Sequence, residues 1–178
     1  MHRGMGYNRA VKSMASFVIL PLLFALSARQ ELFLVQKLCP SCLTIGIIVA
    51  KGEQQDRVGE LEKASIYYNF AVEQENPKKA ADLPAAFASL LKKNINILMV
   101  YEDSVTGDPN AMRYIISQAL EKGIPVICGS EKQLSYGATF FFATKADGTA
   151  LIKVKKAALE SLKLTLPPPD ELPVEVID

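Results

Sequence analysis

Two apolar runs of strand length, residues 95–101 and 124–128, bracket a segment whose apolar residues recur at helical spacing. Nearly continuous apolar strands are typical of a parallel sheet covered by helices on both faces. Asp108 and Pro109 suit the start of the helix, as an N-cap and a first-turn proline, and Gly123 suits its C-terminal cap. The pattern predicts a βαβ unit, in which the carboxyl ends of both strands meet at one edge of the sheet.

The remaining segments continue this alternation of strands and helices. The order predicts a three-layer αβα sandwich with a mainly parallel, five-stranded, Rossmann-like sheet. Residues 172–177 alternate between apolar and other side chains, which suits an added edge strand or a strap across the base of the domain. The expected strands are residues 44–50, 66–72, 95–101, 124–128 and 138–143, and the expected helices are residues 31–38, 54–64, 83–92, 109–122 and 147–162.

The first 28 residues have the pattern of a signal peptide. Arg3, Arg9 and Lys12 precede an apolar run at residues 14–26, which ends among small residues. The alternative is an uncleaved membrane anchor, but the run is about 13 residues long and a bilayer span needs roughly 20. We therefore expect residues 1–28 to be a cleaved signal peptide and residues 29–178 to form a single α/β domain in the periplasm.

Charge and histidine content exclude several functions. Removing residues 1–28 leaves 17 basic and 19 acidic side chains, a net charge of −2, which favours neither nucleic acid nor an anionic membrane as a partner. His2 is the only histidine, so the mature chain lacks the base of Ser-His-Asp and Cys-His catalysis and cannot bind a metal through histidine. No GxGxxG or GxxxxGK[ST] motif occurs, and no cofactor is expected.

Polar and acidic residues follow two of the predicted strands at the edge where their carboxyl ends meet. Glu102 and Asp103 suit a ligand's amino group or general acid-base chemistry, and the alternative is that they solvate the end of a buried strand. Ser130 and Glu131 have a similar alternative, a turn with a helix cap. No nucleophile, base or metal cluster accompanies them, so binding is favoured over catalysis. With Ser104, these residues are the candidates at this edge.

Cys39 and Cys42 form a CxxC pair. In thiol oxidoreductases such a pair follows a strand and opens a helix, whereas this pair precedes a predicted strand. A structural disulfide or two plain thiols is the preferred interpretation, and a thiol oxidoreductase is the alternative. Cys128 ends a predicted parallel strand, about 17 Å from the start of the strand that follows Cys42, so we expect it to stay reduced.

Several short segments along the chain carry a family resemblance. They are residues 38–40, 44–49, 122–131, 137–138 and 172–175. In this order they resemble the substrate-binding proteins of ABC transporters that have the type I periplasmic-binding fold, in the subgroup associated with aromatic amino acids and related small solutes. The resemblance covers nearly all of the chain from Glu31 onward. It corresponds mostly to the second of the two lobes in these proteins and so implies half of a ligand clamp.

The resemblance also implies a site and a role. The ligand-facing loops would contain Lys51 and Gly52, Glu102 to Ser104, and Ser130 with Glu131. The implied role is a non-enzymatic, periplasmic solute-binding-like module for a small solute such as an amino acid, acting with an ABC transport system or a membrane sensor. A homodimer is a further expectation. The alternative is a scaffold domain that keeps the fold without a ligand.

Overall fold

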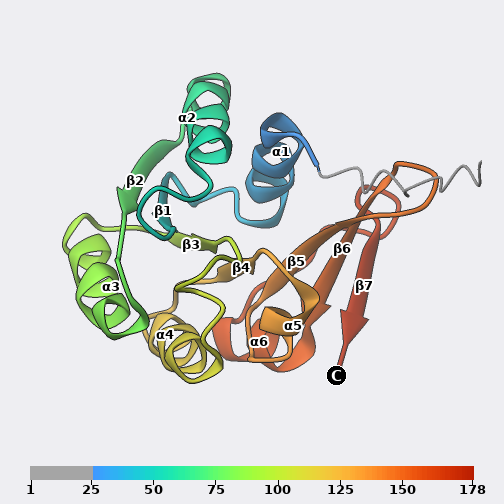
Figure 1. The fold of residues 1–178 in the computed structure, drawn as a ribbon. Coiled ribbons are helices and arrows are strands. Elements are labelled where there is room, and N and C mark those ends of the chain that lie inside the picture. Colours follow the sequence, from blue (N-terminus) through green and yellow to red (C-terminus); the bar gives the residue numbers. More distant parts are fainter. Residues whose placement is uncertain (1–25) are drawn as a thin grey trace, which may run out of the picture.

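The computed structural model describes residues 26–178, so the predicted signal peptide lies almost entirely outside the described residues. These residues form a seven-stranded sheet of order β2-β1-β3-β4-β5-β6-β7 (Figure 1). The first five strands are parallel, β6 is antiparallel to β5, and β7 is parallel to β6. The strands are β1 Thr44–Ile48, β2 Ala71–Glu75, β3 Ile97–Val100, β4 Val126–Cys128, β5 Phe140–Thr144, β6 Ala150–Lys155 and β7 Val174–Ile177.

Helices cover both faces of the sheet and complete the three layers (Figure 1). One face carries α1 and α2, and the other carries α3 and α4, with α6 packed against α4. The mixed α/β class and the three-layer architecture are confirmed. None of the helices within residues 26–178 is long and apolar enough to cross a membrane. The helices are α1 Ala28–Leu38, α2 Gln55–Tyr68, α3 Leu83–Lys92, α4 Pro109–Glu121, α5 Glu131–Leu134 and α6 Lys156–Leu162, with a 3-10 turn at Ala80–Asp82.

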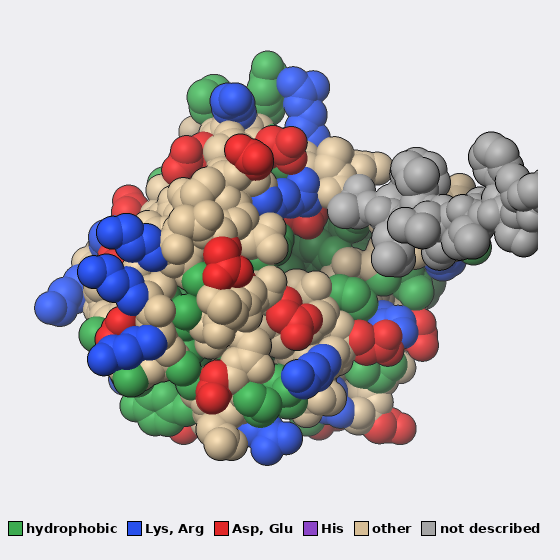
Figure 2. Space-filling model, viewed as in Figure 1, with side chains coloured by type: hydrophobic (Ala, Val, Ile, Leu, Met, Phe, Trp, Pro, Cys, Tyr) green, Lys and Arg blue, Asp and Glu red, His purple; other side chains and the backbone are tan. Residues whose placement is uncertain are grey.

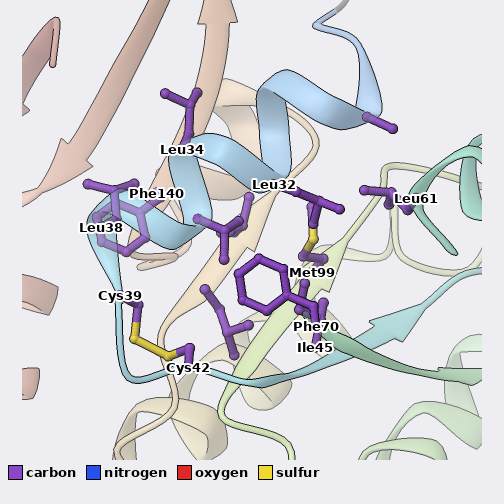
Figure 3. Packing of buried hydrophobic residues seen from close by; sticks show 14 of the residues in the cluster. Leu32, Leu34, Leu38, Cys39, Cys42, Ile45, Leu61, Phe70, Met99 and Phe140 are labelled. Carbon is purple, nitrogen blue, oxygen red and sulfur yellow. A yellow bond between two sulfur atoms is a disulfide. The ribbon is translucent and has the colours of Figure 1, made fainter. Parts of the chain in front are cut away.

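The apolar face of α1 packs on the sheet through fully or almost fully buried side chains (Figure 3). Leu32 and Leu38 of this helix belong to the same cluster as Met99 of β3 and Phe140 of β5. A disulfide between Cys39 and Cys42 closes the short connection from α1 to β1. It joins two buried residues, which fixes the end of α1 at the base of the sheet. The remaining cysteine, Cys128, is free and buried.

The central βαβ unit forms as predicted. β3 and β4 are parallel neighbours, and α4 connects them. The Asp108 side chain caps α4 by accepting a 2.8 Å hydrogen bond from the Ala111 N–H, and Pro109 is the first helical residue. Gly123 follows the helix with a φ of 74°, a left-handed conformation that glycine adopts without strain. Strong apolar runs and both helix-end signals agree here, which is why the prediction succeeds.

The strand predicted over residues 66–72 is wrong. Helix α2 continues to Tyr68, and β2 begins only at Ala71. Asn69, which interrupts the apolar run, lies in the left-handed region with a φ of 57° and ends the helix. Asparagine tolerates this conformation better than most residues, so it is a helix stop signal rather than a weak point of a strand.

The helix predicted from Asp147 is also wrong over its first half, where β6 forms instead, and the other strand beyond the predicted five is the tail, β7. Asp147 and Gly148 form a tight turn between β5 and β6, in which Gly148 has a φ of 83°. The Asp147 carboxylate accepts hydrogen bonds from the N–H and hydroxyl of Thr149. An Asp-Gly pair between apolar runs is a hairpin signal. The sheet is therefore extended by β6 and β7, and the tail forms an edge strand.

Candidate functional site

Asp103 organises the loops at the carboxyl edge of the sheet. One carboxylate oxygen accepts a 2.6 Å hydrogen bond from the N–H of Ala50, two residues after the end of β1. The other accepts hydrogen bonds from the N–H groups of Val105 and Thr106, at 2.8 and 2.7 Å. These bonds use both oxygens on backbone groups of two loops. Asp103 thus joins the loops after β1 and β3.

Gln133 joins the loop after β3 to the loop after β4. Its side chain is almost fully buried, accepts a hydrogen bond from the Gly129 N–H at 3.0 Å and donates one to the Thr106 carbonyl at 3.2 Å. A Cβ at Gly129 would come within 2.9 Å of the Glu102 N and Tyr101 Cα atoms, so the loops approach each other as closely as backbone allows. We call Asp103, Thr106 and Gln133 the loop brace.

The structure brings the three predicted loops to the same edge of the sheet, but most of the predicted polar side chains already bind other groups of the protein. Lys51, Gly52 and Glu102 are exposed to solvent. The remaining predicted residues bind neighbours within the protein. The Ser104 hydroxyl donates to Glu53, the Ser130 hydroxyl accepts from the Gln133 N–H at the start of α5, and Glu131 pairs with Lys153 at 2.6 Å.

A cavity of about 450 Å³ opens beside the brace, on the α1–α2 side of the same edge. It lies between the first turns of α1 and α2 and the carboxyl ends of β3, β4 and β5. In Figure 2 it is a hollow with hydrophobic side chains inside and charged side chains at its rim. Its apolar lining consists of Leu26, Met99, Val100, Ile127, Phe141, Phe142 and Ala143.

Three polar side chains line one end of this cavity. Glu31 of α1 binds Arg57 of α2 at 2.5 Å and accepts a 2.9 Å hydrogen bond from the hydroxyl of Tyr101, which follows β3. Arg57 also donates to the carbonyl of Leu26 at 2.6 Å and pairs with Glu60 at 3.2 Å. We call Glu31, Arg57 and Tyr101 the cavity cluster. It holds opposite charges and a hydroxyl at the edge of an apolar hollow.

Burial dominates the electrostatics of the cluster. It raises the pKa of the Glu31 carboxyl above its ordinary value, and the nearby Arg57 guanidinium offsets this only in part. Burial also raises the pKa of the Tyr101 phenol well above its ordinary value, and the Glu31 charge adds to the rise. The pKa of Cys128, another lining residue, rises to about 12 for the same reason. At neutral pH this thiol is protonated and therefore unreactive.

Sequence reasoning missed the cavity cluster. Glu31 and Arg57 looked like ordinary polar residues in the first turns of two helices, and Tyr101 like the last residue of an apolar strand. A positional signal was available for two of the three: Arg57 starts a helix after a parallel strand and Tyr101 follows one, and such residues lie at the ligand-binding edge of an α/β sheet. Glu31 lies in a helix that precedes the first strand, so this signal does not apply to it. Within residues 26–178, no group of three or more Cys, His, Asp or Glu side chains is placed to hold a metal ion.

Comparisons with solved structures show a fold shared with several proteins, among them a substrate binding protein. The chain superposes on a conserved domain protein from Vibrio cholerae O1 biovar eltor with a TM-score of 0.72 at 16% identity, covering 86% of this chain and 61% of that one. An ABC domain from Streptococcus pneumoniae in complex with L-Trp gives 0.72 at 14%, covering 85% and 60%. CD0873, a Clostridium difficile substrate binding protein with adhesive properties, gives 0.71 at 19%, covering 86% and 61%.

These likenesses establish a shared fold at low sequence identity. The chain spans about three fifths of the length of the proteins it superposes on. No protein-family model matches the sequence, and no curated protein matches it. The resemblance to ABC-type solute-binding proteins is confirmed as a likeness of fold over most of the chain.

Proposed function

We propose that this chain is a non-enzymatic, solute-binding-like module that is exported to the periplasm and acts with an ABC transport system or a membrane sensor. The observation that carries the proposal is the cavity at the carboxyl edge of β3, β4 and β5. Ligands of open α/β sheets bind at this edge. The shared fold with an L-Trp-bound ABC domain and a substrate binding protein supports a binding role.

The cavity's size and lining indicate the chemical class of the solute. Its volume of about 450 Å³ lies within the range of small-molecule sites. The lining is mostly apolar and includes Phe141 and Phe142, which favours an aliphatic or aromatic group. Arg57 and Glu31 at one end offer partners for a carboxylate and an amino group. A small amino acid with an apolar side chain satisfies all three features.

The exposed loop residues extend this site rather than form it. Lys51, Gly52 and Glu102 remain available to a ligand or partner, because their side chains or backbone face solvent at the same edge. Asp103, Ser104, Ser130 and Glu131 would act indirectly, because their polar atoms bind within the protein. None of these predicted residues is among those that line the cavity, although the same three loops contribute Gln54, Tyr101 and Gly129 to it, and the cavity cluster lies at one end.

A single lobe limits the expected affinity. Two-lobed binding proteins bury a ligand by closing over it, and one lobe leaves one side of the ligand in water. Much of the favourable burial is lost while the cost of immobilising the ligand remains, so we expect affinity of about millimolar for the isolated monomer. Tight binding requires a second surface from a homodimer or a membrane partner over Glu102 and Ser130.

Calorimetry with a panel of amino acids and aromatic acids tests the proposal, with the oligomeric state fixed by light scattering. Ala143 lines the cavity, so Ala143→Trp should fill it and abolish any heat of binding. Ala88→Trp, on the exposed side of α3, is the matched control and should bind as the natural chain does. Equal binding by both variants would place the ligand elsewhere, and micromolar binding by a proven monomer would contradict the half-clamp argument.

The scaffold and oxidoreductase alternatives predict different results. A scaffold without a ligand gives no thermal shift with any solute yet keeps its partner binding when Ala143 is replaced by Trp. An oxidoreductase reduces insulin with turnover. The second outcome is disfavoured because Cys39 and Cys42 are both buried and lie after α1 rather than at the start of a helix.

A further inference from the structure

The outer surface of α1 and α2 exposes apolar side chains among basic ones. Ile66 and Tyr67, at the end of α2, are 80% and 71% exposed, and Phe33 of α1 is 42% exposed. Arg29, Phe33 and Lys37 repeat at four-residue spacing and therefore share one side of α1. With Lys63 of α2, they form what we call the α1–α2 outer surface. Its members are Arg29, Phe33, Lys37, Lys63, Ile66 and Tyr67.

The cations and the apolar groups of this surface are paired with each other. The Arg29 guanidinium lies 4.4 Å from the centre of the Tyr67 ring, and the Lys37 ammonium lies 5.8 Å from the centre of the Phe33 ring. An open groove of about 760 Å³ runs between the start of α1 and the end of α2, lined by Arg29, Lys63, Ile66 and Tyr67 among others. Aromatic rings flanked by Lys and Arg are typical of proteins that lie at a lipid–water interface.

The apolar N-terminal run reaches the fold next to this surface, at Leu26, which lines the cavity and is followed directly by the groove residues Ser27 and Ala28. Residues 14–26 are apolar, and Leu26 is already buried in the domain. Ser27 caps α1 and, like Ala28, lines the groove. There is thus no spacer between the apolar run and the surface. Wherever the run enters a membrane, the start of α1 and the adjoining end of α2 must lie beside the lipid headgroups.

We propose that, in the chain that retains residues 1–25, the α1–α2 outer surface lies on a lipid bilayer that contains anionic headgroups. A run of about 13 apolar residues is too short to span a bilayer and holds a domain only weakly, so stable attachment requires a second contact. Phe33, Ile66 and Tyr67 supply apolar groups for that contact. This inference concerns a different surface from the cavity and does not depend on ligand binding.

The local charge of this surface differs from that of the whole chain, whose net charge of +1 indicates no membrane partner. Arg29, Lys37 and Lys63 are exposed there, and each adds attraction to anionic lipid. The nearby acidic side chains are Glu60 and Glu62, of which Glu60 is paired with Arg57. The surface is therefore basic overall, and the attraction should weaken at high salt.

Site-specific fluorescence tests which face meets the lipid. The chain contains no tryptophan, so Tyr67→Trp and Tyr114→Trp each introduce a single reporter. Tyr114 is 52% exposed on α4, across the sheet from α1 and α2, and is the matched control. The full-length chain is synthesised in a system that lacks signal peptidase, so that residues 1–25 stay attached. It is then mixed with phosphatidylglycerol–phosphatidylethanolamine vesicles that carry brominated acyl chains. We expect quenching and a blue shift at position 67 and neither at position 114.

Three outcomes overturn the proposal. Absence of quenching at both positions means that the surface does not meet lipid, and equal quenching means that the domain has no preferred face. A concentration-dependent blue shift at position 67 without vesicles indicates self-association through this surface. In support, the Ile66→Asp/Tyr67→Asp variant should bind anionic vesicles at least about tenfold more weakly than Tyr114→Asp at an unchanged melting temperature, because two apolar side chains no longer enter the interface and two carboxylates face anionic headgroups.

Discussion

Two sides of one sheet edge use polar side chains differently. On the α3–α4 side, the loop brace binds backbone N–H and carbonyl groups of neighbouring loops, and the loops pack too closely for a side chain at position 129. On the α1–α2 side, the cavity cluster binds mainly its own members and leaves a hollow of about 450 Å³. A carboxylate that binds backbone fixes loops, whereas a carboxylate that binds a cation and a hydroxyl at a cavity can exchange partners with a ligand.

The cavity cluster should show the largest effects. Arg57→Met leaves the Glu31 carboxylate buried with only Tyr101 as a partner, so we expect a loss of about 4 kcal/mol in the free energy of unfolding. Glu31→Gln should cost only about 1 kcal/mol, because Arg57 keeps Glu60 and the Leu26 carbonyl as partners. Urea unfolding of both variants measures the asymmetry. Equal losses of stability would show that Glu60 and the Leu26 carbonyl do not compensate Arg57 for the loss of Glu31.

The loss of unfolding free energy caused by Arg57→Met should also depend on pH. Arg57 lowers the pKa of Glu31, so without it the folded-state pKa rises further above the ordinary value. A raised folded-state pKa means that stability is highest at low pH, where the carboxyl is protonated, and is lost as pH rises through the folded-state pKa. The penalty should therefore be smaller near about pH 5 than near about pH 8. A penalty that grows on acidification would contradict this assignment.

On the braced side, Asp103→Asn should destabilise the fold by about 3 kcal/mol. The amide NH₂ replaces an oxygen that accepts from the Ala50 N–H, which places two donors face to face and weakens the bonds to Val105 and Thr106. Glu102→Gln, at the adjacent exposed position, is the control and should change stability by less than about 0.5 kcal/mol. If the losses are reversed, Glu102 rather than Asp103 holds the edge together.

The sequence predicts much of the braced side and little of the cavity side. The loops containing Asp103 and Ser130 could be located because each follows a strongly apolar strand, and parallel strands place their carboxyl ends together. What these side chains bind depends on backbone groups of other loops, such as the Ala50 N–H, which no local pattern specifies. Sequence reasoning thus found the edge but not the function of each residue on it.

The sequence could locate Arg57 and Tyr101 at the edge of the sheet but not their pairing with Glu31, because that pairing depends on how three elements pack. Glu31, Arg57 and Tyr101 come from α1, α2 and the end of β3, and no spacing relates them. In the fold, the errors arose where a local turn signal outweighed apolar periodicity. Asn69 ends a helix and Asp147 opens a hairpin, and both positions were interpreted by the pattern of their neighbours instead.

Gly129 allows a sharper test of the close packing on the braced side. Gly129→Ala places a Cβ within 2.9 Å of backbone atoms of Glu102 and Tyr101, which cannot move without separating β3 and β4, so we expect a loss of about 2 kcal/mol. Gly59→Ala is the matched control, since Gly59 lies within α2 and the added Cβ meets nothing within 4 Å beyond the backbone of its own helix and its chain neighbours. It should stabilise the protein by about 0.5 kcal/mol or more through helix propensity. In thermal unfolding, Gly129→Ala should therefore lower the melting temperature and Gly59→Ala should raise it.

The smallest expected effect concerns Ser27, where the cavity side meets the N-terminal run. Ser27 and Gln30 form a capping box at the start of α1, in which the Ser27 hydroxyl accepts from the Gln30 N–H and the side-chain Oε1 of Gln30 accepts from the Ser27 N–H. Ser27→Ala should therefore cost about 1 kcal/mol, measured by urea unfolding of the full chain. Ser117→Ala, on the exposed side of α4, is the control and should cost close to nothing, because its 3.3 Å hydrogen bond to Glu121 is exposed to water and alanine is the better helix former.

This cap also bears on where a signal peptidase cuts. A mature chain that begins near Arg29, as the small residues before it predict, lacks Ser27 and also Leu26, whose carbonyl binds Arg57 and whose side chain lines the cavity. Such a chain should be less stable than Ser27→Ala, and its Arg57 should be freer to bind a carboxylate. Mass spectrometry of the periplasmic fraction gives the mature N-terminus. A chain that starts at or before Leu26 retains the cap and the cavity wall, whereas intact Met1–Asp178 in the membrane fraction contradicts cleavage altogether.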